Sequence, residues 1–216
     1  MLITILILAT CASNPAKKES RTGMNSRETA LLNEYSEERK EKYADYIVDI
    51  GKYTTNGAEY QKKYYKYLVG IAGDIIENRK LGIVRGSIGF YYDKKSQEKG
   101  RLFLGLDIDT GRYSENDYSE AALKLLKEFT AGIIETINAC NTIFDEKEII
   151  GMVIGFRWKS GKGEDQVNIW INEADVIRFE KKVLTFDELI QRSTITDTSG
   201  KIIIFQLLTG APNRYS

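Results

Sequence analysis

Two helical patterns open the part of the chain that follows residue 25. Apolar side chains recur three or four positions apart over residues 27–50 and again over residues 58–78, which predicts two amphipathic helices. A Thr-Asn-Gly sequence, typical of turns, lies between them, so we expect an antiparallel helical hairpin. Tyrosines are concentrated in this part of the chain, and their rings serve either as the packed side of the helices or as a face for a partner.

After residue 82 the pattern becomes one of alternating apolar and polar positions, which indicates strands with one buried face. The strands predicted in this way span residues 83–92, 101–109, 148–159, 166–171 and 201–208. A charged connection at 93–100 and a turn rich in glycine at 160–165 separate neighbouring strands. Each of these two connections predicts a β-hairpin.

Helical spacing returns three times among the strands. Residues 117–141 form a long, strongly apolar pattern that predicts the central packing helix, and shorter helices are predicted over 173–181 and 185–192. The last of them begins with Thr185 three positions before Glu188. This spacing is that of a capping box, in which the two side chains bond to each other's backbone N–H groups.

The sequence therefore predicts an α+β fold in which helices cover an antiparallel sheet of five or six strands. Residues 87–92, Ser-Ile-Gly-Phe-Tyr-Tyr, are similar to residues 153–158, Val-Ile-Gly-Phe-Arg-Trp. Each is followed by a second strand and a helix, so the body is either a ββα-ββα duplication or carries a chance match. We expect the helical hairpin to span residues 26–80 and the α+β domain to span residues 81–216.

The amino-terminal residues have a different character. Residues 2–9 form one apolar run, and the residues up to 25 are small, polar and basic. The run is too short to span a bilayer, which needs ~20 residues, but it has the length of a signal-peptide core. Its end, Leu8-Ala9-Thr10-Cys11, resembles the lipobox at which bacterial lipoprotein precursors are modified and cleaved.

This resemblance implies that residues 1–10 are a signal peptide and that the Cys11 thiol carries a diacylglyceryl group. Residues 11–25 would then be a lipidated, flexible tether. The implied location is the bacterial cell envelope, with the body at the periplasmic or outer face of a membrane. The alternative is that translation begins at Met24, which would make the protein a cytosolic interaction protein.

Composition excludes several classes of function. Lys and Arg total 31, as do Asp and Glu, so the chain lacks the excess of positive charge that nucleic-acid binding requires. The absence of histidine excludes Ser-His and Cys-His nucleophiles and histidine-ligated metals. We expect no cofactor and no metal. Cys140 falls on the apolar side of the long helix, so we expect a buried structural thiol.

The best candidate for catalysis is the segment 105–111, Gly-Leu-Asp-Ile-Asp-Thr-Gly. It superficially resembles the Asp-x-Asp-x-Thr nucleophile motif of haloacid-dehalogenase-like phosphotransferases. That resemblance implies a hydrolase or phosphotransferase in which Asp107 and Asp109 hold a divalent metal or attack phosphorus. In that family the motif follows the first strand of a βαβ arrangement, whereas here it is predicted to close a hairpin. Alternation places both aspartates on the solvated face of the strand.

Taken together, these features favour a membrane-anchored envelope lipoprotein with a non-catalytic role in binding, scaffolding or assembly. Its expected partners are the membrane, through the lipid on Cys11, and another envelope protein. The carboxylate-dependent and metal-dependent enzyme using Asp107 and Asp109 remains the main alternative.

Overall fold

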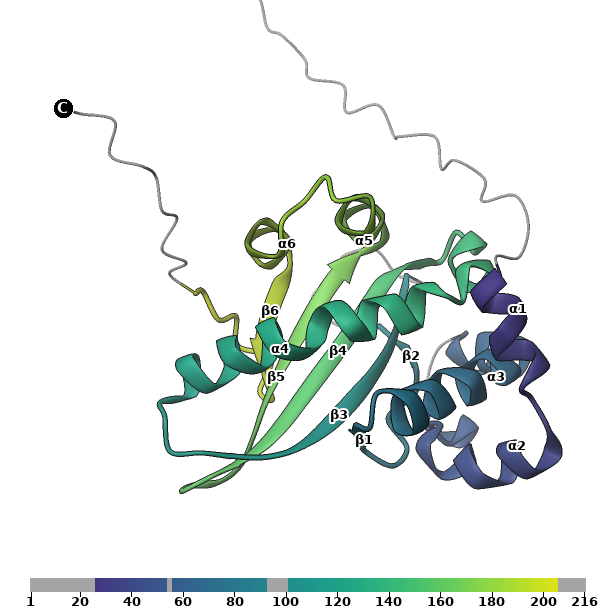
Figure 1. The fold of residues 1–216 in the computed structure, drawn as a ribbon, viewed down its shortest axis with the longest axis horizontal. Coiled ribbons are helices and arrows are strands. Elements are labelled where there is room, and N and C mark those ends of the chain that lie inside the picture. Colours follow the sequence, from purple (N-terminus) through teal and green to yellow (C-terminus); the bar gives the residue numbers. More distant parts are fainter. Residues whose placement is uncertain (1–25, 54–55, 93–100, 206–216) are drawn as a thin grey trace, which may run out of the picture.

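A six-stranded sheet and a set of helices make up the part of the chain that the computed structural model describes, residues 26–53, 56–92 and 101–205 (Figure 1). The predicted signal peptide, Cys11, the tether, Met24 and the connection 93–100 lie outside these residues. The α+β class predicted from the sequence is confirmed.

The strands follow the order β1-β3-β4-β5-β6, and β2 pairs with β3 on the same side as β1. Their bounds are β1 (Gly82–Ile83), β2 (Gly89–Tyr91), β3 (Leu102–Ser114), β4 (Ile149–Ser160), β5 (Gly163–Asn172) and β6 (Thr194–Asp197). All pairs are antiparallel except β3 with β4, which run parallel over almost their whole length. The sheet is therefore mostly antiparallel with one parallel pair at its centre.

The parallel pair arises because α4 (Tyr118–Asn138) connects β3 to β4. Parallel neighbours need a crossover of a dozen or more residues, and a helix of 21 residues returns the chain to the starting end of β3. The sequence of elements, β2-β3-α4 followed by β4-β5-α5, is the ββα-ββα order expected from the similar segments. However, β2 has 3 residues and β4 has 12, and a duplication stays a prediction.

The helical elements are α1 (Ser26–Asn33), α2 (Glu37–Tyr43), η1 (Ala44–Tyr46), η2 (Ile50–Lys52), α3 (Gly57–Gly73), η3 (Asp74–Asn78), α4, η4 (Asn141–Asp145), α5 (Glu173–Glu180) and α6 (Phe186–Arg192). The single helix expected over 27–50 is wrong. Ser36 ends that pattern because its side chain accepts a hydrogen bond from the Arg39 N–H and starts a new helix. The capping box of Thr185 and Glu188 is confirmed at the start of α6.

Two strand predictions are also corrected. The segment 83–92 is not one strand, because Gly86 has φ +66°, which turns the chain between β1 and β2. The last strand lies at Thr194–Asp197 rather than at 201–208. Within the described part of 201–208, Ile202 forms only an isolated bridge with Thr196, and residues 206–208 lie outside the described range.

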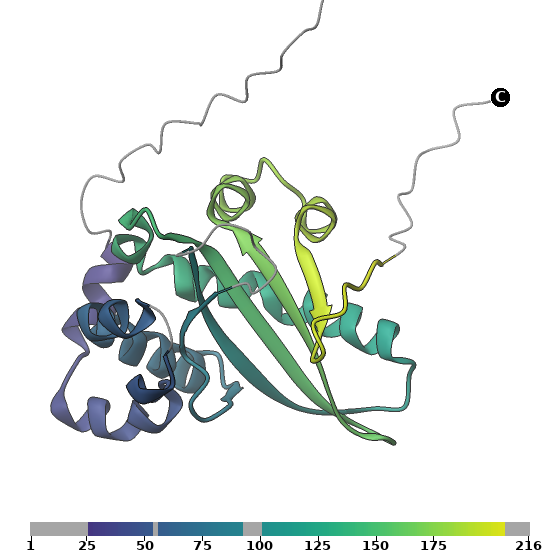
Figure 2. The same cartoon turned by 180° about the vertical axis from the view of Figure 1, so that it is seen from behind.

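One face of the sheet holds the core. Side chains of alternate positions on β4 point toward α4, where Phe156 stacks with Phe129 at 6.2 Å and Trp158 contacts Tyr118 at 5.2 Å between ring centroids. Helix α3 covers the same face further along, since Tyr60 packs on Phe90 of β2. Figure 2 shows the opposite side, with the strands in front of α4.

The amino-terminal helices share this core with the sheet. Buried residues of α2 and α3 belong to the same hydrophobic cluster as buried residues of the strands and of α4. The helical segment therefore packs as part of the α+β body. Among the described residues no helix is long and apolar enough to cross a membrane.

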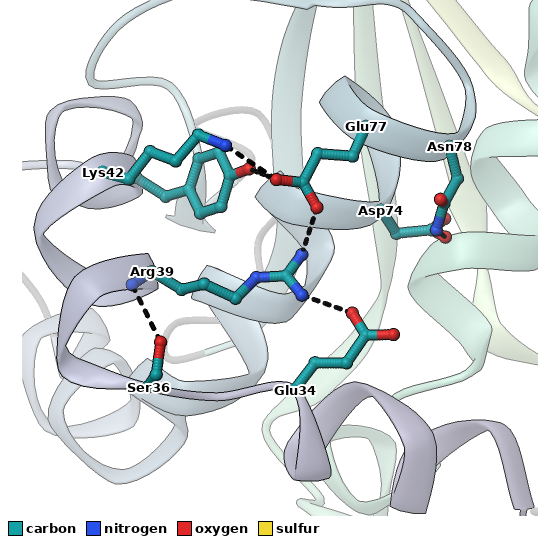
Figure 3. A network of polar contacts seen from close by, with 8 residues as sticks. Glu34, Ser36, Arg39, Lys42, Asp74, Glu77 and Asn78 are labelled. Carbon is teal, nitrogen blue, oxygen red and sulfur yellow. Dashed lines mark hydrogen bonds and ion pairs between the residues drawn. The ribbon is translucent and has the colours of Figure 1, made fainter.

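A polar network joins α2 to η3, the helical segment that continues α3 (Figure 3). The Glu77 carboxylate accepts hydrogen bonds from Arg39 Nη2 and Lys42 Nζ, both at 2.7 Å, and from the Tyr43 hydroxyl. These bonds hold the pKa of Glu77 down at about 2, with the Lys42 bond as the largest cause. Arg39 reaches this position across Gly73, where a Cβ would overlap its guanidinium. The network determines where α2 lies against α3.

We predict that Glu77→Gln destabilises the protein at neutral pH by about 1 kcal/mol, a value that allows for screening because the Glu77 side chain is 38% exposed. An ionised Glu77 with a lowered pKa stabilises the fold above the ordinary value of 4.5, and this stabilisation is lost as the pH falls from there through about 2. Urea unfolding of both proteins at neutral pH and at about pH 3 measures the difference, which should shrink in acid.

The matched control is Glu38→Gln, which removes an exposed carboxylate from α2 and should show no such pH dependence. A Glu77→Gln protein as stable as the parent at neutral pH would contradict the role of the network.

Candidate functional site

The face of the sheet opposite α4, which we call the open face, carries polar side chains at its centre. On β3, β4 and β5 the positions that alternate with core residues are occupied by Asp107, Arg157, Gln166 and Asn168. They lie on neighbouring strands, because Asp107 pairs with Gly155, which in turn pairs with Asn168. We call these four residues the open-face cluster.

Direct hydrogen bonds join the members of the open-face cluster. Arg157 Nη2 donates to Asp107 Oδ2 at 3.1 Å, and Gln166 Nε2 donates to Asp107 Oδ1 at 3.2 Å. The same Gln166 nitrogen donates to Asn168 Oδ1 at 2.6 Å, and Asn168 Nδ2 donates to the Asp197 carbonyl at 3.3 Å. The cluster is thus a continuous network across three strands that ends on the backbone of β6.

The absence of a side chain at Gly155 makes this convergence possible. A Cβ at this position would overlap the Asp107 carboxylate and would lie 2.7 Å from Gln166 Nε2 and 2.9 Å from Asn168 Oδ1. The three side chains therefore meet in the space above the Gly155 backbone. Any other residue at position 155 would separate them.

The backbone of Asp107 is held in place at the gap between β1 and β2. The Asp107 N–H donates to Ser87 Oγ at 3.1 Å, and the Asp107 carbonyl accepts from the Val84 N–H at 2.9 Å. Ser87 is buried and lies in the loop that follows Gly86. The turn at Gly86, which interrupts the strand predicted over 83–92, therefore places the Ser87 hydroxyl where it accepts the hydrogen bond of the Asp107 N–H.

The electrostatics of the open-face cluster are not optimised for stability. Burial raises the pKa of Asp107, and the neighbouring Arg157 and Gln166 oppose this effect only in part. Arg157 Nε is buried and has no hydrogen-bond partner among the described residues. A buried donor without a partner costs about 1–3 kcal/mol. Such an arrangement is typical of a site retained for function.

Aromatic side chains border the open-face cluster on one side. Trp170 follows Asn168 by two positions on β5, so it lies on the same face. Its indole contacts Phe103 of β3 edge to face, with 5.1 Å between ring centroids. Phe103 is buried but does not belong to the main core cluster, whereas Trp170 is partly exposed. The open face thus offers an aromatic surface beside hydrogen-bonding groups.

The structure places the two candidate aspartates on the same face, as alternation predicts, but gives them separate partners. Asp107 bonds to Arg157 and Gln166, while Asp109 Oδ1 accepts from the Gly111 N–H at 3.0 Å, where the register of β3 with β4 is irregular. Among the described residues no group of three or more His, Cys, Asp and Glu side chains could hold a metal ion.

The expected hairpin context of the segment 105–111 is wrong in one respect. The strand that carries it pairs in parallel with β4 through α4, which is a βαβ arrangement. However, Asp107 lies within β3, which continues to Ser114, rather than in a loop beyond the end of the strand. Its side chain is only 25% exposed, and the cation beside it is Arg157.

The structure tests the prediction made for one of the two cysteines, Cys140, and not the prediction made for the other. Cys140 is completely buried after the end of α4, and burial raises the pKa of its thiol, which confirms the expected structural thiol. Cys11, the predicted lipid attachment residue, lies outside the described residues.

A hollow of about 310 Å³ lies away from the open-face cluster, between α1, η3 and the end of α4. Its charged groups bond to one another: Arg27 pairs with Glu135 at 2.6 Å, and Arg79 donates to Glu135 at 3.2 Å and to Thr136 at 2.5 Å. The Thr136 hydroxyl also donates to Asp74 at 2.5 Å. This mutual pairing ties α1 and η3 to α4 and favours a structural role over ligand binding.

Sequence reasoning found Asp107 but missed Arg157, Gln166 and Asn168. A signal was present, because each of them alternates with an apolar residue on a predicted strand and so shares the solvated face. Alternation within a strand does not show that β3, β4 and β5 are neighbours in a register that brings these residues to Asp107.

Comparison of the chain with protein-family models, with curated proteins and with solved structures found no match. The site is therefore interpreted from its geometry.

We predict that Arg157→Gln raises the pKa of Asp107 further, because the burial of the carboxyl remains while its cation is removed. A raised pKa stabilises the fold below the unfolded value and loses that effect as the pH rises through the folded value. The variant should therefore lose roughly 2 kcal/mol of unfolding free energy at neutral pH. It should lose less at about pH 4.

Carboxyl ¹³C chemical shifts followed through a pH titration measure the pKa of Asp107 in both proteins. Lys159→Gln, an exposed change two positions along β4, should leave this pKa unaltered. An unchanged or lower pKa in Arg157→Gln would show that the ion pair does not control Asp107.

Proposed function

We propose that this protein is a membrane-anchored lipoprotein of the bacterial envelope with a non-catalytic binding role, and that the open face of its sheet is the binding surface. The anchor is the lipid that the lipobox-like sequence implies on Cys11. The body projects from the membrane on residues 11–25 and presents the open face to its ligand.

The observation that carries the binding role is the open-face cluster. A polar network lies on the side of the sheet opposite α4, and it holds a largely buried carboxylate and a buried Arg157 Nε that has no hydrogen-bond partner in the part of the chain that the structure describes. Replacing a largely buried ion pair by well-packed apolar residues is often neutral or stabilising, so stability alone does not require the pair. A ligand that bonds to the cluster gives a reason for retaining it.

A binding role is favoured over metal-dependent catalysis by the partners of the two aspartates. The Asp107 carboxylate is bonded to Arg157, whose positive charge would repel a divalent metal at that carboxylate. Asp109 bonds to the backbone of its own strand at Gly111. The two carboxylates therefore have separate partners and are not arranged as two ligands of one metal ion.

The anchor is tested by the intact mass of the native protein from its own cells, with partition into detergent measured in parallel. We expect a mature chain that begins at Cys11 and carries the mass of a diacylglyceryl group. Cys11→Ser should remain unmodified and lose the partition into detergent. A water-soluble parent chain that begins at Met1 or Met24 would contradict the lipoprotein assignment.

The binding surface is tested by photo-cross-linking in intact cells. A benzophenone residue replaces Thr194, which is exposed and pairs with Trp170 at the border of the open face. We expect an adduct, identified by mass spectrometry, whose yield falls clearly when Asn168→Ala is combined with the benzophenone residue. The matched control places the same group at Lys124, exposed on α4 at the opposite face.

Equal adducts at positions 194 and 124 would mean that the open face has no special role. No adduct at position 194 would contradict the proposed binding surface, whatever the outcome at the lipid anchor.

A further inference from the structure

We propose that the ligand of the open face is a neutral oligosaccharide, with a sugar ring held between the open-face cluster and Trp170. This inference rests on the proposed binding role and adds the chemical class of the ligand. It follows from the polar groups that the network leaves available, from its charge balance and from the position of the aromatic surface.

The first argument is the inventory of hydrogen-bonding groups. Among the described residues no hydrogen bond uses the side-chain oxygen Oε1 of Gln166, while Nε2 of the same amide donates to both Asp107 and Asn168. The Asp107 and Arg157 side chains are 25% and 30% exposed, so both can be reached from solvent. A ligand must therefore donate to carbonyl or carboxylate oxygens and accept from a guanidinium. A hydroxyl group does both, and a sugar offers several at fixed positions.

The second argument is charge. Asp107 and Arg157 form an ion pair at 3.1 Å, so the centre of the cluster carries no net charge. An anionic ligand would face the Asp107 carboxylate, and a cationic ligand would face the Arg157 guanidinium. In either case the ligand would have to give up part of its hydration without a matching countercharge. A neutral polar ligand avoids this cost.

The third argument is the aromatic side chain beside the polar groups. Asn168 and Trp170 are two positions apart on β5, which places their Cα atoms roughly 7 Å apart on one face. This spacing is comparable to the width of a sugar ring. The C–H side of a sugar packs on the electron-rich face of an aromatic ring, while its hydroxyl groups reach the amides. Phe103 supports the indole from below the exposed surface.

Tryptophan emission provides a direct measurement. The sequence has two tryptophans, and Trp158 is only 2% exposed on the opposite face, so only Trp170 should respond to a ligand on the open face. The mature protein in detergent is titrated with linear oligomers of N-acetylglucosamine, of β-linked glucose and of α-linked glucose. Isothermal titration calorimetry of the same samples gives an independent affinity.

We expect at least one of the three neutral oligomers to change the emission in a saturable way. Gln166→Ala and Asn168→Ala should each weaken binding about tenfold, the effect of losing one hydrogen bond to the ligand. Trp170→Ala should abolish binding. Lys162→Ala, an exposed change in the β4–β5 turn, should leave the affinity unchanged.

Gly155→Ala provides a variant that removes no hydrogen-bonding group. Its methyl group would separate Asp107, Gln166 and Asn168, and the atoms displaced are side-chain ends that can move without unfolding the sheet. Thermal unfolding checks that each variant is folded. A folded Gly155→Ala protein that binds as well as the parent would overturn the assignment of the sugar to the cluster.

The remaining outcomes separate the inference from the proposed function. No saturable response to any of the three oligomers overturns the saccharide proposal. If a protein is then cross-linked at Thr194, the binding role stands with a different ligand. If neither sugar binding nor an adduct is found, both proposals fail. Tighter binding of oligogalacturonate, an anionic oligosaccharide, than of all the neutral oligomers would overturn the charge argument.

Discussion

The parallel pairing of β3 with β4 is the constraint on which the rest of the structure depends. It requires a crossover, and α4 provides it by crossing one face of the sheet. The same crossover decides which side chains are buried, since Phe156 and Trp158 meet α4 while Arg157 between them faces the other way. A strand has two faces, so covering one side of a central pair turns the alternate positions of both strands, Asp107 and Arg157 among them, toward the other face.

The open face uses that freedom for polar groups that stability does not require. The cluster keeps a carboxylate with a raised pKa and a buried Arg157 Nε without a partner among the described residues. Gly155 has no Cβ, and this leaves room above its backbone for the side chains of Asp107, Gln166 and Asn168 to meet. The cluster, the glycine and the aromatic pair of Phe103 and Trp170 form one surface, and the proposed saccharide site rests on their combination.

The polar groups at the amino-terminal end act differently. Around Glu77 and Arg39, and around Arg79 and Glu135, each charge has a close partner of opposite sign. Lys42 and Tyr43 add to the first group, and the pKa of Glu77 is lowered in consequence. These networks fix short helices that share the core of the sheet. The direction of the pKa shift distinguishes these networks from the open-face cluster. The pKa of Glu77 is lowered because its neighbours stabilise the ionised carboxylate, whereas the pKa of Asp107 is raised because burial destabilises the ionised form.

The sequence by itself determined the α+β class, the central helix, the β4–β5 hairpin, the capping box at Thr185 and the burial of Cys140. All of these depend on local periodicity or on residues close together in the chain, which a single sequence displays. Alternation also placed Asp107 and Asp109 on one face. Periodicity predicted one helix over 27–50 and one strand over 83–92, and both predictions were wrong. Ser36 caps a new helix within the first segment, and Gly86 turns the chain within the second.

Only the tertiary structure decided that β3 and β4 run parallel and that Asp107 meets Arg157, Gln166 and Asn168. These residues are 50 or more positions from Asp107 in the chain. Their proximity follows from strand order and register, which are fixed by burying one face of every strand against a common set of helices. That is a property of the whole packing, and no local segment of the sequence carries it.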